Sequence, residues 1–145
     1  MSKTYDPKMH SAEHILNQAM VRLLGCDRCF SAHINRKKSK CDYHFERPLS
    51  NREVKEIEGE VNRVIQKDYS IVIEQMSRAT AEKEFNLVRV PEREGLSEFR
   101  IVRMGEYDAC PCIGPHVLST GEIGVFVITS TGYEDNVLRI RFKLS

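Results

Sequence analysis

Four residues of this sequence have the types and the spacing of a metal-binding or hydrolytic site. His10 and His14 are four positions apart, and such positions share one face of a helix, so both imidazoles can point at one ion or one substrate atom. Much later in the chain, Cys112 and His116 add a thiol and a third imidazole. Imidazole nitrogens and thiolates are ligands that suit zinc. The sequence therefore predicts one shared site made of His10, His14, Cys112 and His116.

The second half of this site lies in the segment 110–116, which reads Cys-Pro-Cys-Ile-Gly-Pro-His. Proline restricts φ, and glycine admits backbone conformations that are closed to other residues. Two prolines and a glycine so close together predict a loop of defined shape, neither a helix nor a strand interior. Such a loop can hold Cys112 and His116 in place at a low conformational cost.

The first half is predicted to lie on an opening helix. Asp6 is a good N-cap, Pro7 suits the first helical position, and Gly25 is a plausible end. Apolar residues at helical spacing form the expected core face: Met9, Ala12, Leu16, Ala19, Met20 and Leu23. The adjacent stripe is made of His10, His14, Asn17 and Val21. We therefore expect the two histidines to lie at the border between the core face and a cleft.

The composition is that of one globular domain, and we expect residues 1–145 to form it. Hydrophobic residues make up 41% and charged residues 30% of the chain, as in ordinary globular proteins. No apolar run approaches the ~20 residues that a membrane span needs, and no signal peptide is recognisable. Five cysteines without an export signal favour a reducing compartment, the cytoplasm. A formal net charge of +1 excludes a strongly basic, non-specific nucleic-acid binder but leaves room for a local basic patch.

The remaining elements mix helices and strands without a regular βαβ alternation. Ser50 and Glu53 form a capping box before a second amphipathic helix. We expect a short helix at 79–85 and strands at 30–34, 41–45, 69–73, 87–90, 99–104, 123–128 and 137–142. The near-continuous apolar strand at 123–128 is predicted to be central. The sequence thus predicts an α+β, two-layer sandwich: a curved, mostly antiparallel sheet with two main helices packed on one face.

Two further motifs have weaker interpretations. Cys26 and Cys29 form a C-x-x-C, but a zinc ribbon needs a second such pair, so we interpret them as loop thiols. The stretch 35–40 joins two predicted strands and is the most basic of the chain. It is either a solvated hairpin tip or a phosphate-binding loop, with these cations: Arg36, Lys37, Lys38 and Lys40.

Taken together, the motifs resemble a known family. The chain begins with a His-x-x-x-His helix, which is followed by a basic hairpin and by a helix preceded by Pro-Leu. After these come a Cys-x-Gly-x-His-Val segment, the sequence Thr-Gly-Glu-Ile-Gly and a closing Leu-Arg-Ile strand. The chain is similar to the editing domain shared by alanyl- and threonyl-tRNA synthetases and by freestanding alanyl-tRNA editing proteins. The resemblance extends from about His10 to the C-terminus.

This resemblance implies a trans-acting aminoacyl-tRNA deacylase, which hydrolyses serine or glycine wrongly attached to the acceptor end of tRNA, here most simply the tRNA for alanine. It implies that His10, His14, Cys112 and His116 are catalytic and hold zinc, and that the basic loop contacts tRNA. We expect neither a membrane nor DNA as a partner, and no aminoacylation domain; the sequence predicts no oligomeric state. The Gly-Pro-His ending of the loop is similar to threonyl members, in which catalysis proceeds without zinc, so seryl-tRNA for threonine and a metal-free site stay open.

The residues themselves leave three mechanisms open. Four protein ligands close a tetrahedral zinc site, whereas catalytic zinc keeps a position free, so one ligand stays uncoordinated or the ion expands its shell. Without metal, the histidines would hold and polarise the water, with Asp108, Glu13 and Thr120 as possible supporting partners. The stretch His10 to His14 also fits H-x-x-E-H, an inverted zinc-protease motif, although such proteases use a distal acidic ligand. Finally, the chain could be an inactive module that only binds tRNA or a synthetase.

Overall fold

The computed structural model describes residues 6–85 and 97–145, and it confirms the predicted α+β class. The elements in chain order are α1 (Pro7–Leu24), β1 (Ser31–His33), β2 (Ser39–His44), α2 (Asn51–Lys67), β3 (Ile71–Ser77), α3 (Arg78–Glu84), β4 (Glu98–Met104), β5 (Asp108–Pro111), the 3-10 helix η2 (Thr120–Ile123), β6 (Phe126–Glu134) and β7 (Val137–Leu144). The strand predicted at 87–90 lies outside the described residues. No helix among the described residues has the length and apolar character needed to cross a membrane.

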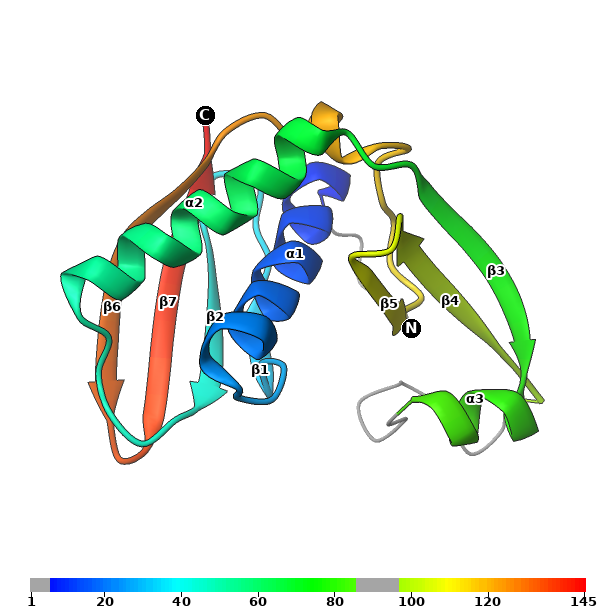
Figure 1. Cartoon of the computed structure of the whole chain (residues 1–145), viewed down its shortest axis with the longest axis horizontal. Helices are drawn as coiled ribbons and strands as arrows, with labels where there is room; N and C mark the ends of the chain where they lie inside the picture. Colours follow the sequence, from blue (N-terminus) through cyan, green and yellow to red (C-terminus); the bar gives the residue numbers. More distant parts are fainter. Residues whose placement is uncertain (1–5, 86–96) are drawn as a thin grey trace.

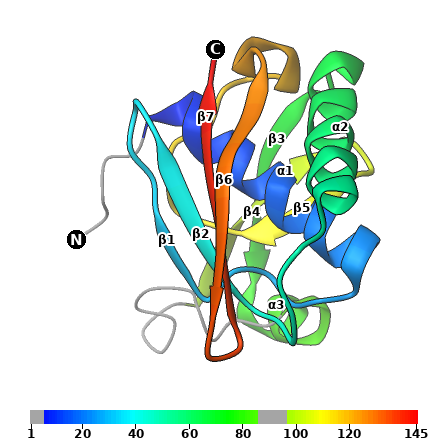
Figure 2. The same ribbon diagram turned by 90° about the vertical axis from the view of Figure 1, so that its left-hand side faces the viewer.

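The strands are antiparallel, as predicted, and are divided between two sheets. One sheet has the order β1-β2-β7-β6 and the other β3-β4-β5. Figure 1 shows α1 between the two sheets, and Figure 2 shows α1 and α2 behind one face of the four-stranded sheet. The main hydrophobic core contains residues of both sheets and both long helices. The helix that carries two predicted site residues is therefore the central element of the fold.

The ends of the two long helices follow the predicted capping chemistry. The Asp6 carboxylate accepts a hydrogen bond from the backbone N–H of Met9, and Gly25 ends α1 in a left-handed conformation. Ser50 and Glu53 form the predicted capping box at the start of α2. The prediction for Leu23 was wrong, because its side chain is 42% exposed in the last turn of α1, where Leu24 packs against the main core instead.

The apolar segment at 123–128 is not a central strand, which corrects the prediction. Its first residues belong to η2, and β6 begins at Phe126 at the edge of the four-stranded sheet. Helix α2 covers this edge: the Asn62 side chain accepts from the backbone N–H of Phe126 and donates to its C=O, at 2.8 and 2.9 Å. The Glu58 carboxylate accepts from the N–H of Ile128 at 2.8 Å. An edge with its backbone groups paired in this way is protected from association, so an edge strand can be as apolar as a central one.

The basic stretch forms the turn between β1 and β2. Arg36, Lys37 and Lys38 are exposed, whereas Lys40 is half-buried at the start of β2. The buried Ser39 hydroxyl closes the turn with two hydrogen bonds to the backbone of Asn35. Figure 2 shows this turn at the same end of the molecule as the start of α1.

We predict that Asn62→Asp lowers the free energy of unfolding by about 1–3 kcal/mol, because a carboxylate oxygen would replace the N–H donor that the Phe126 carbonyl needs. Urea unfolding at neutral pH measures the change. Asn51→Asp is the matched control, since it adds the same charge at an exposed position of the same helix; a change within about 0.5 kcal/mol is expected there. Equal losses in the two variants would contradict the edge-pairing role of Asn62.

Candidate functional site

The first half of α1 is buried on all sides, and this places His10 and His14 inside the molecule. Every residue from 9 to 17 is buried, the polar ones included. One side of this segment packs into the main core, and the other faces β5 and the loop that follows it. The histidines were expected at the edge of the buried face, but they are 3% and 4% exposed. A buried polar side chain needs partners, and these partners define the site.

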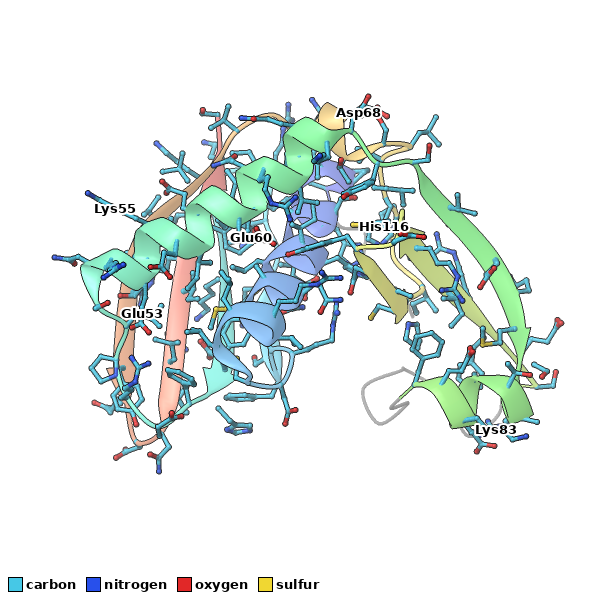
Figure 3. All side chains as sticks on the ribbon, in the orientation of Figure 1. Glu53, Lys55, Glu60, Asp68, Lys83 and His116 are labelled. Carbon is cyan, nitrogen blue, oxygen red and sulfur yellow. The ribbon has the colours of Figure 1, made fainter. Side chains whose placement is uncertain are left out.

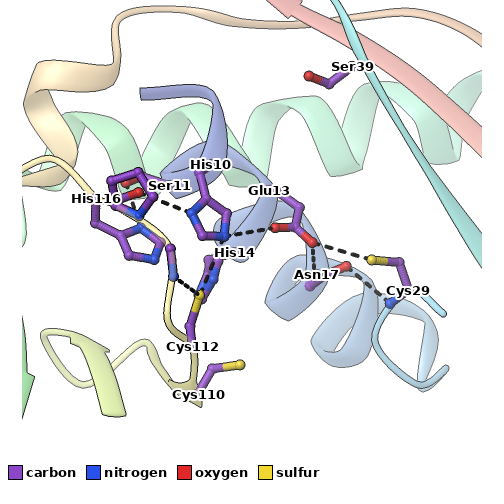
Figure 4. Close-up of polar contacts among 12 residues, drawn as sticks. His10, Ser11, Glu13, His14, Asn17, Cys29, Ser39, Cys110, Cys112 and His116 are labelled. Atoms are coloured by element: carbon purple, nitrogen blue, oxygen red, sulfur yellow. Dashed lines mark hydrogen bonds and ion pairs between the residues drawn. The ribbon is translucent and has the colours of Figure 1, made fainter. Parts of the chain in front are cut away.

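The structure brings the four predicted site residues to one point. One ligand atom from each of His10, His14, Cys112 and His116 lies within 4.8 Å of the others. The ring centroid of His116 is 4.3 Å from that of His10 and 4.4 Å from that of His14. The Cys112 sulfur lies 3.4 Å from His10 Nε2 (Figure 4). Figure 3 shows His116 between α1 and the three-stranded sheet. The catalytic and metal-binding roles of the four residues remain predictions.

Two of the three imidazoles, those of His10 and His116, are held from the outer nitrogen. His10 Nδ1 is 3.0 Å from the carbonyl oxygen of Pro115, which can only accept, so Nδ1 donates. His116 Nδ1 is 2.9 Å from the Ser11 hydroxyl. In metal centres, a partner on the outer nitrogen fixes the ring and its tautomer so that the inner nitrogen can bind. The rings of His10 and His116 are thus oriented so that their inner nitrogens can bind a ligand.

The loop that carries Cys112 is tied down more firmly than its sequence indicated. Its first residues, Cys110 and Pro111, are the last two of β5, and the rest of the segment follows that strand as a loop. The Arg100 guanidinium donates to the carbonyl oxygens of Cys112 and Gly114, both at 2.8 Å. A Cβ atom at Gly114 would collide with the His10 ring. The loop therefore presses against the histidine, and only glycine fits there.

Burial and the neighbouring imidazoles set the charge of the Cys112 thiol. Burial by itself raises its pKa, but hydrogen bonds from His10, His116 and His14 outweigh burial and lower the pKa to about 3. His14 has the opposite shift: burial lowers its pKa, but Asp108 and Cys112 raise it well above the ordinary value. The pKa of His116 is lowered to about 4, first of all by burial. At neutral pH, Cys112 is therefore a thiolate and His116 a neutral imidazole.

A second group of potential ligands lies on the other side of the helix but has a different character. The side chains of Glu13, Cys29 and Cys41 are buried within 4.8 Å of one another. The Cys29 thiol donates to Glu13 Oε2 at 3.4 Å, and the Asn17 amide donates to the same oxygen at 3.3 Å. Burial raises the pKa of Cys41 well above its ordinary value, which opposes the thiolate that a metal needs. This group is a hydrogen-bonded part of the core, and it agrees with the interpretation of Cys29 as a structural thiol.

Cys110 does not join the cluster, although it is two residues from Cys112. It is absent from the group of converging ligand atoms, and in Figure 4 it lies beside Cys112. Burial raises the pKa of its thiol. Thr120, considered as a supporting residue, instead donates to the carbonyl of Val64 at the end of α2 and accepts from the N–H of Tyr69. Cys110 therefore provides a matched control for Cys112, and Thr120 has a structural role.

The residues fit a bound metal ion. Three imidazoles and one thiolate are a ligand set that suits zinc. Among the described residues, His116 Nε2 is one of two buried side-chain nitrogens or oxygens without a hydrogen-bond partner. A buried nitrogen without a hydrogen-bond partner costs free energy, and a bound ion would give it a partner.

Two residues that support the site were not found from the sequence. Ser11 holds His116, and it also accepts from the backbone N–H of Val117 at 3.3 Å. Arg100 holds the loop by hydrogen bonds to the carbonyl oxygens of Cys112 and Gly114. A serine on a helix and an arginine on an alternating strand carry no local signal of such roles, because both contacts are made across long sequence separations.

The structure is thus an antiparallel α+β domain with a buried imidazole–thiolate cluster between a helix and a loop. Comparison with known proteins identifies the family. Residues 99–141 match the family described as "Threonyl and Alanyl tRNA synthetase second additional domain". This segment contains Cys112 and His116, the whole of β5 and β6, and most of β4 and β7.

The similarity to alanine–tRNA ligases extends along the whole chain. The ligase of Coxiella burnetii is 34% identical over 134 residues, which is 90% of this chain and 15% of the ligase. The ligase of Methanopyrus kandleri is 33% identical over 141 residues, 92% of this chain and 15% of the ligase. The ligase of Nitrosopumilus maritimus is 33% identical over 139 residues, 93% of this chain and 16% of the ligase. The predicted relationship to this editing-domain family is confirmed, and the chain corresponds to a small part of each ligase.

The electrostatics of the cluster predict an unusual alkylation profile for Cys112. A lowered pKa keeps a thiol deprotonated at every pH above it, so with a pKa of about 3 the thiolate fraction of Cys112 stays nearly constant between about pH 5 and about pH 8. Its iodoacetamide rate in the metal-free chain should therefore change less than about threefold over this range. Mass spectrometry of the alkylated peptide measures the rate. Cys110, with its raised pKa, should react faster as pH rises; parallel profiles would contradict the thiolate assignment.

Proposed function

We propose that this chain is an aminoacyl-tRNA deacylase that acts in trans and hydrolyses the ester of a wrongly attached amino acid. The observation that carries the proposal is the convergence of His10, His14, Cys112 and His116 on one buried point, in a chain related to alanine–tRNA ligases over nine-tenths of its length. Ester hydrolysis needs an oriented water, stabilisation of charge at the carbonyl, and groups that move a proton. The cluster can supply all three.

The chain's own residues have complementary protonation states for this reaction. Neutral His116 can accept a proton from the attacking water, because its Nε2 is buried and has no partner. His14, with its raised pKa, can donate a proton to the leaving ribose oxygen. The Cys112 thiolate stabilises the protonated form of His14. Water adds to the carbonyl carbon, the bond to the ribose oxygen breaks, and the products are a free amino acid and an uncharged tRNA end.

Zinc is the cofactor that we propose, held by ligands from the set His10, His14, Cys112 and His116. When bound, it supplies a water of lowered pKa, about 7, and a positive charge near the carbonyl. One of the four residues then stays uncoordinated, or the shell expands, because four protein ligands would close a tetrahedral site. In a metal-free form, the same residues would hold the water by hydrogen bonds.

The polar lining of the cluster favours substrates with a hydroxyl. A buried site that hydrogen-bonds a hydroxyl discriminates strongly against an analogue without it. We therefore propose seryl-tRNA as the preferred substrate, with glycyl-tRNA as a second, and the tRNA for alanine as the carrier, because the relatives are alanine–tRNA ligases. The Gly114-Pro115-His116 ending supports serine on the tRNA for threonine as the alternative. A charged-tRNA substrate would place the activity in the cytoplasm.

The exposed turn between β1 and β2 is our candidate for a tRNA phosphate contact. Arg36, Lys37 and Lys38 are exposed at the end of the molecule where α1 starts (Figure 2), and Lys40 lies beside them. His10 is in the first turns of that helix. A strand of tRNA that reaches the cluster from this end would pass these cations. Phosphate contacts of this kind add affinity without reading sequence.

An inactive tRNA- or synthetase-binding module is the second candidate. The convergence of His10, His14, Cys112 and His116 on one buried point argues against it, because a module that only binds has no need of such a cluster. The inverted zinc-protease interpretation has less support, because the distal groups at the histidine pair are Cys112 and His116, not a carboxylate. Glu13 lies 3.6 Å from His10 Nε2, but its other oxygen accepts hydrogen bonds from Asn17 and Cys29.

Purified chain should release serine from seryl-tRNA for alanine, and it should leave alanyl-tRNA largely intact. Chelation should abolish the activity and zinc should restore it. Cys112→Ala should lower the rate by about a hundredfold or more, because it removes a ligand and a charged group, whereas Cys110→Ala should retain most of it. If serine is released faster from the tRNA for threonine, that tRNA is the substrate in place of the tRNA for alanine. Equally slow release of serine from both tRNAs would favour the binding module.

Replacing Lys37 and Lys38 by Gln should weaken tRNA binding. It should also make the slope of log K against log salt concentration shallower, by the amount that about two lost phosphate contacts would give. Filter binding or fluorescence anisotropy at several salt concentrations measures the slope. Lys55→Gln with Lys67→Gln is the matched control, since both lysines are exposed on α2. A slope like that of the unmodified chain would identify the turn as a solvated hairpin tip.

A further inference from the structure

An ion pair with a buried carboxylate and a partly exposed arginine lies next to His14. The Asp108 side chain, at the start of β5, is 1% exposed. Arg28, in the connection after α1, donates to both of its oxygens: one nitrogen of the guanidinium to Oδ1 at 2.8 Å and the other to Oδ2 at 3.4 Å. Two segments far apart in the sequence are thus joined against the middle of α1.

The oxygen with the longer contact to Arg28, Asp108 Oδ2, faces the outer nitrogen of His14. Asp108 Oδ2 lies 3.8 Å from His14 Nδ1, both side chains being almost fully buried. His14 Nδ1 is the second of the two orphaned buried side-chain atoms among the described residues, with no hydrogen bond as short as 3.5 Å. The carboxylate is therefore placed to pair with this nitrogen, and a small approach would make a charge-assisted hydrogen bond.

The other two imidazoles already have such outer partners. His10 Nδ1 donates to the Pro115 carbonyl, and His116 Nδ1 contacts the Ser11 hydroxyl. We propose that Asp108, oriented by Arg28, is a positioning residue that keeps a proton on His14 Nδ1 and so directs His14 Nε2 to the Cys112 side of the cluster. This inference rests on the proposed function, since it gives the third ring of the same site its outer partner.

The geometry gives Asp108→Asn a specific consequence. The shortest contact with Arg28 is at Oδ1, so the amide oxygen of Asn would take that position to accept from the guanidinium. The amide NH2 would then occupy the Oδ2 position and face His14 Nδ1. Two donors cannot share that contact, so His14 Nδ1 would lose its proton and Nε2 would carry it, toward the metal-binding side.

Removing the arginine should reverse this effect. In the double variant Arg28→Met with Asp108→Asn, no donor fixes the amide oxygen, and the amide can turn its oxygen to His14 Nδ1. If the Asp108–Arg28 pair had only a structural role, the double variant should be at least as impaired as the single one, because it removes both partners of the pair. The Asp42–Arg139 pair is a matched control: it is also bidentate, at 2.7 and 2.9 Å, and it joins β2 to β7 away from the cluster.

The test has two readouts that need no tRNA. Long-range ¹H–¹⁵N NMR of the metal-free chain should show a proton on His14 Nδ1 in the unmodified protein, none in Asp108→Asn, and its return in the double variant. Competition with a chromophoric chelator should show zinc affinity about 10–100-fold lower in Asp108→Asn, largely regained in the double variant, and unchanged in Asp42→Asn.

Three results would overturn the inference: an unmodified chain whose His14 Nδ1 carries no proton, an Asp108→Asn variant that keeps it, or a double variant no better than the single one. The first needs no substitution, so the inference stays testable if a variant does not fold. A failure of deacylation by the unmodified chain, with the expected NMR pattern, would count against the proposed function alone.

Discussion

The burial of the first half of α1 is the constraint on which the rest of the structure depends. Residues 9–17 are enclosed by the main core on one side and by β5 and its loop on the other. A helix enclosed in this way must satisfy its polar side chains inside the protein. The polar residues of this segment do so in two directions: His10, Ser11 and His14 toward the loop, and Glu13 and Asn17 toward the loop after α1 and the sheet.

These two directions have opposite electrostatic character. On the loop side, three imidazoles lower the pKa of Cys112 enough to make it a thiolate. On the sheet side, burial and the neighbouring Cys29 and Glu13 raise the pKa of Cys41. Both thiols are on strands or strand ends and both approach the same helix. The difference follows from what surrounds each sulfur, since burial disfavours a charge unless an opposite charge or a donor is close.

The loop contributes rigidity as well as ligands. Arg100 ties two of its carbonyls to β4, and Gly114 lets it press against the His10 ring. Catalytic and metal sites need their groups held within a fraction of an ångström of the productive arrangement. In this chain, backbone carbonyls and one arginine provide that support, so the loop needs no secondary structure of its own beyond β5.

The sequence by itself determined the features that depend on local chemistry. The spacing of His10 and His14, the caps of α1 and α2, and the shape of the Cys112 loop follow from neighbouring residues, and the α+β class follows from their order. Only the tertiary structure decided which strands form which sheet, why the apolar β6 lies at an edge under Asn62, and that Arg28 and Asp108 meet beside His14. Such features depend on contacts between distant segments, and the free energy of those contacts is absent from any local pattern.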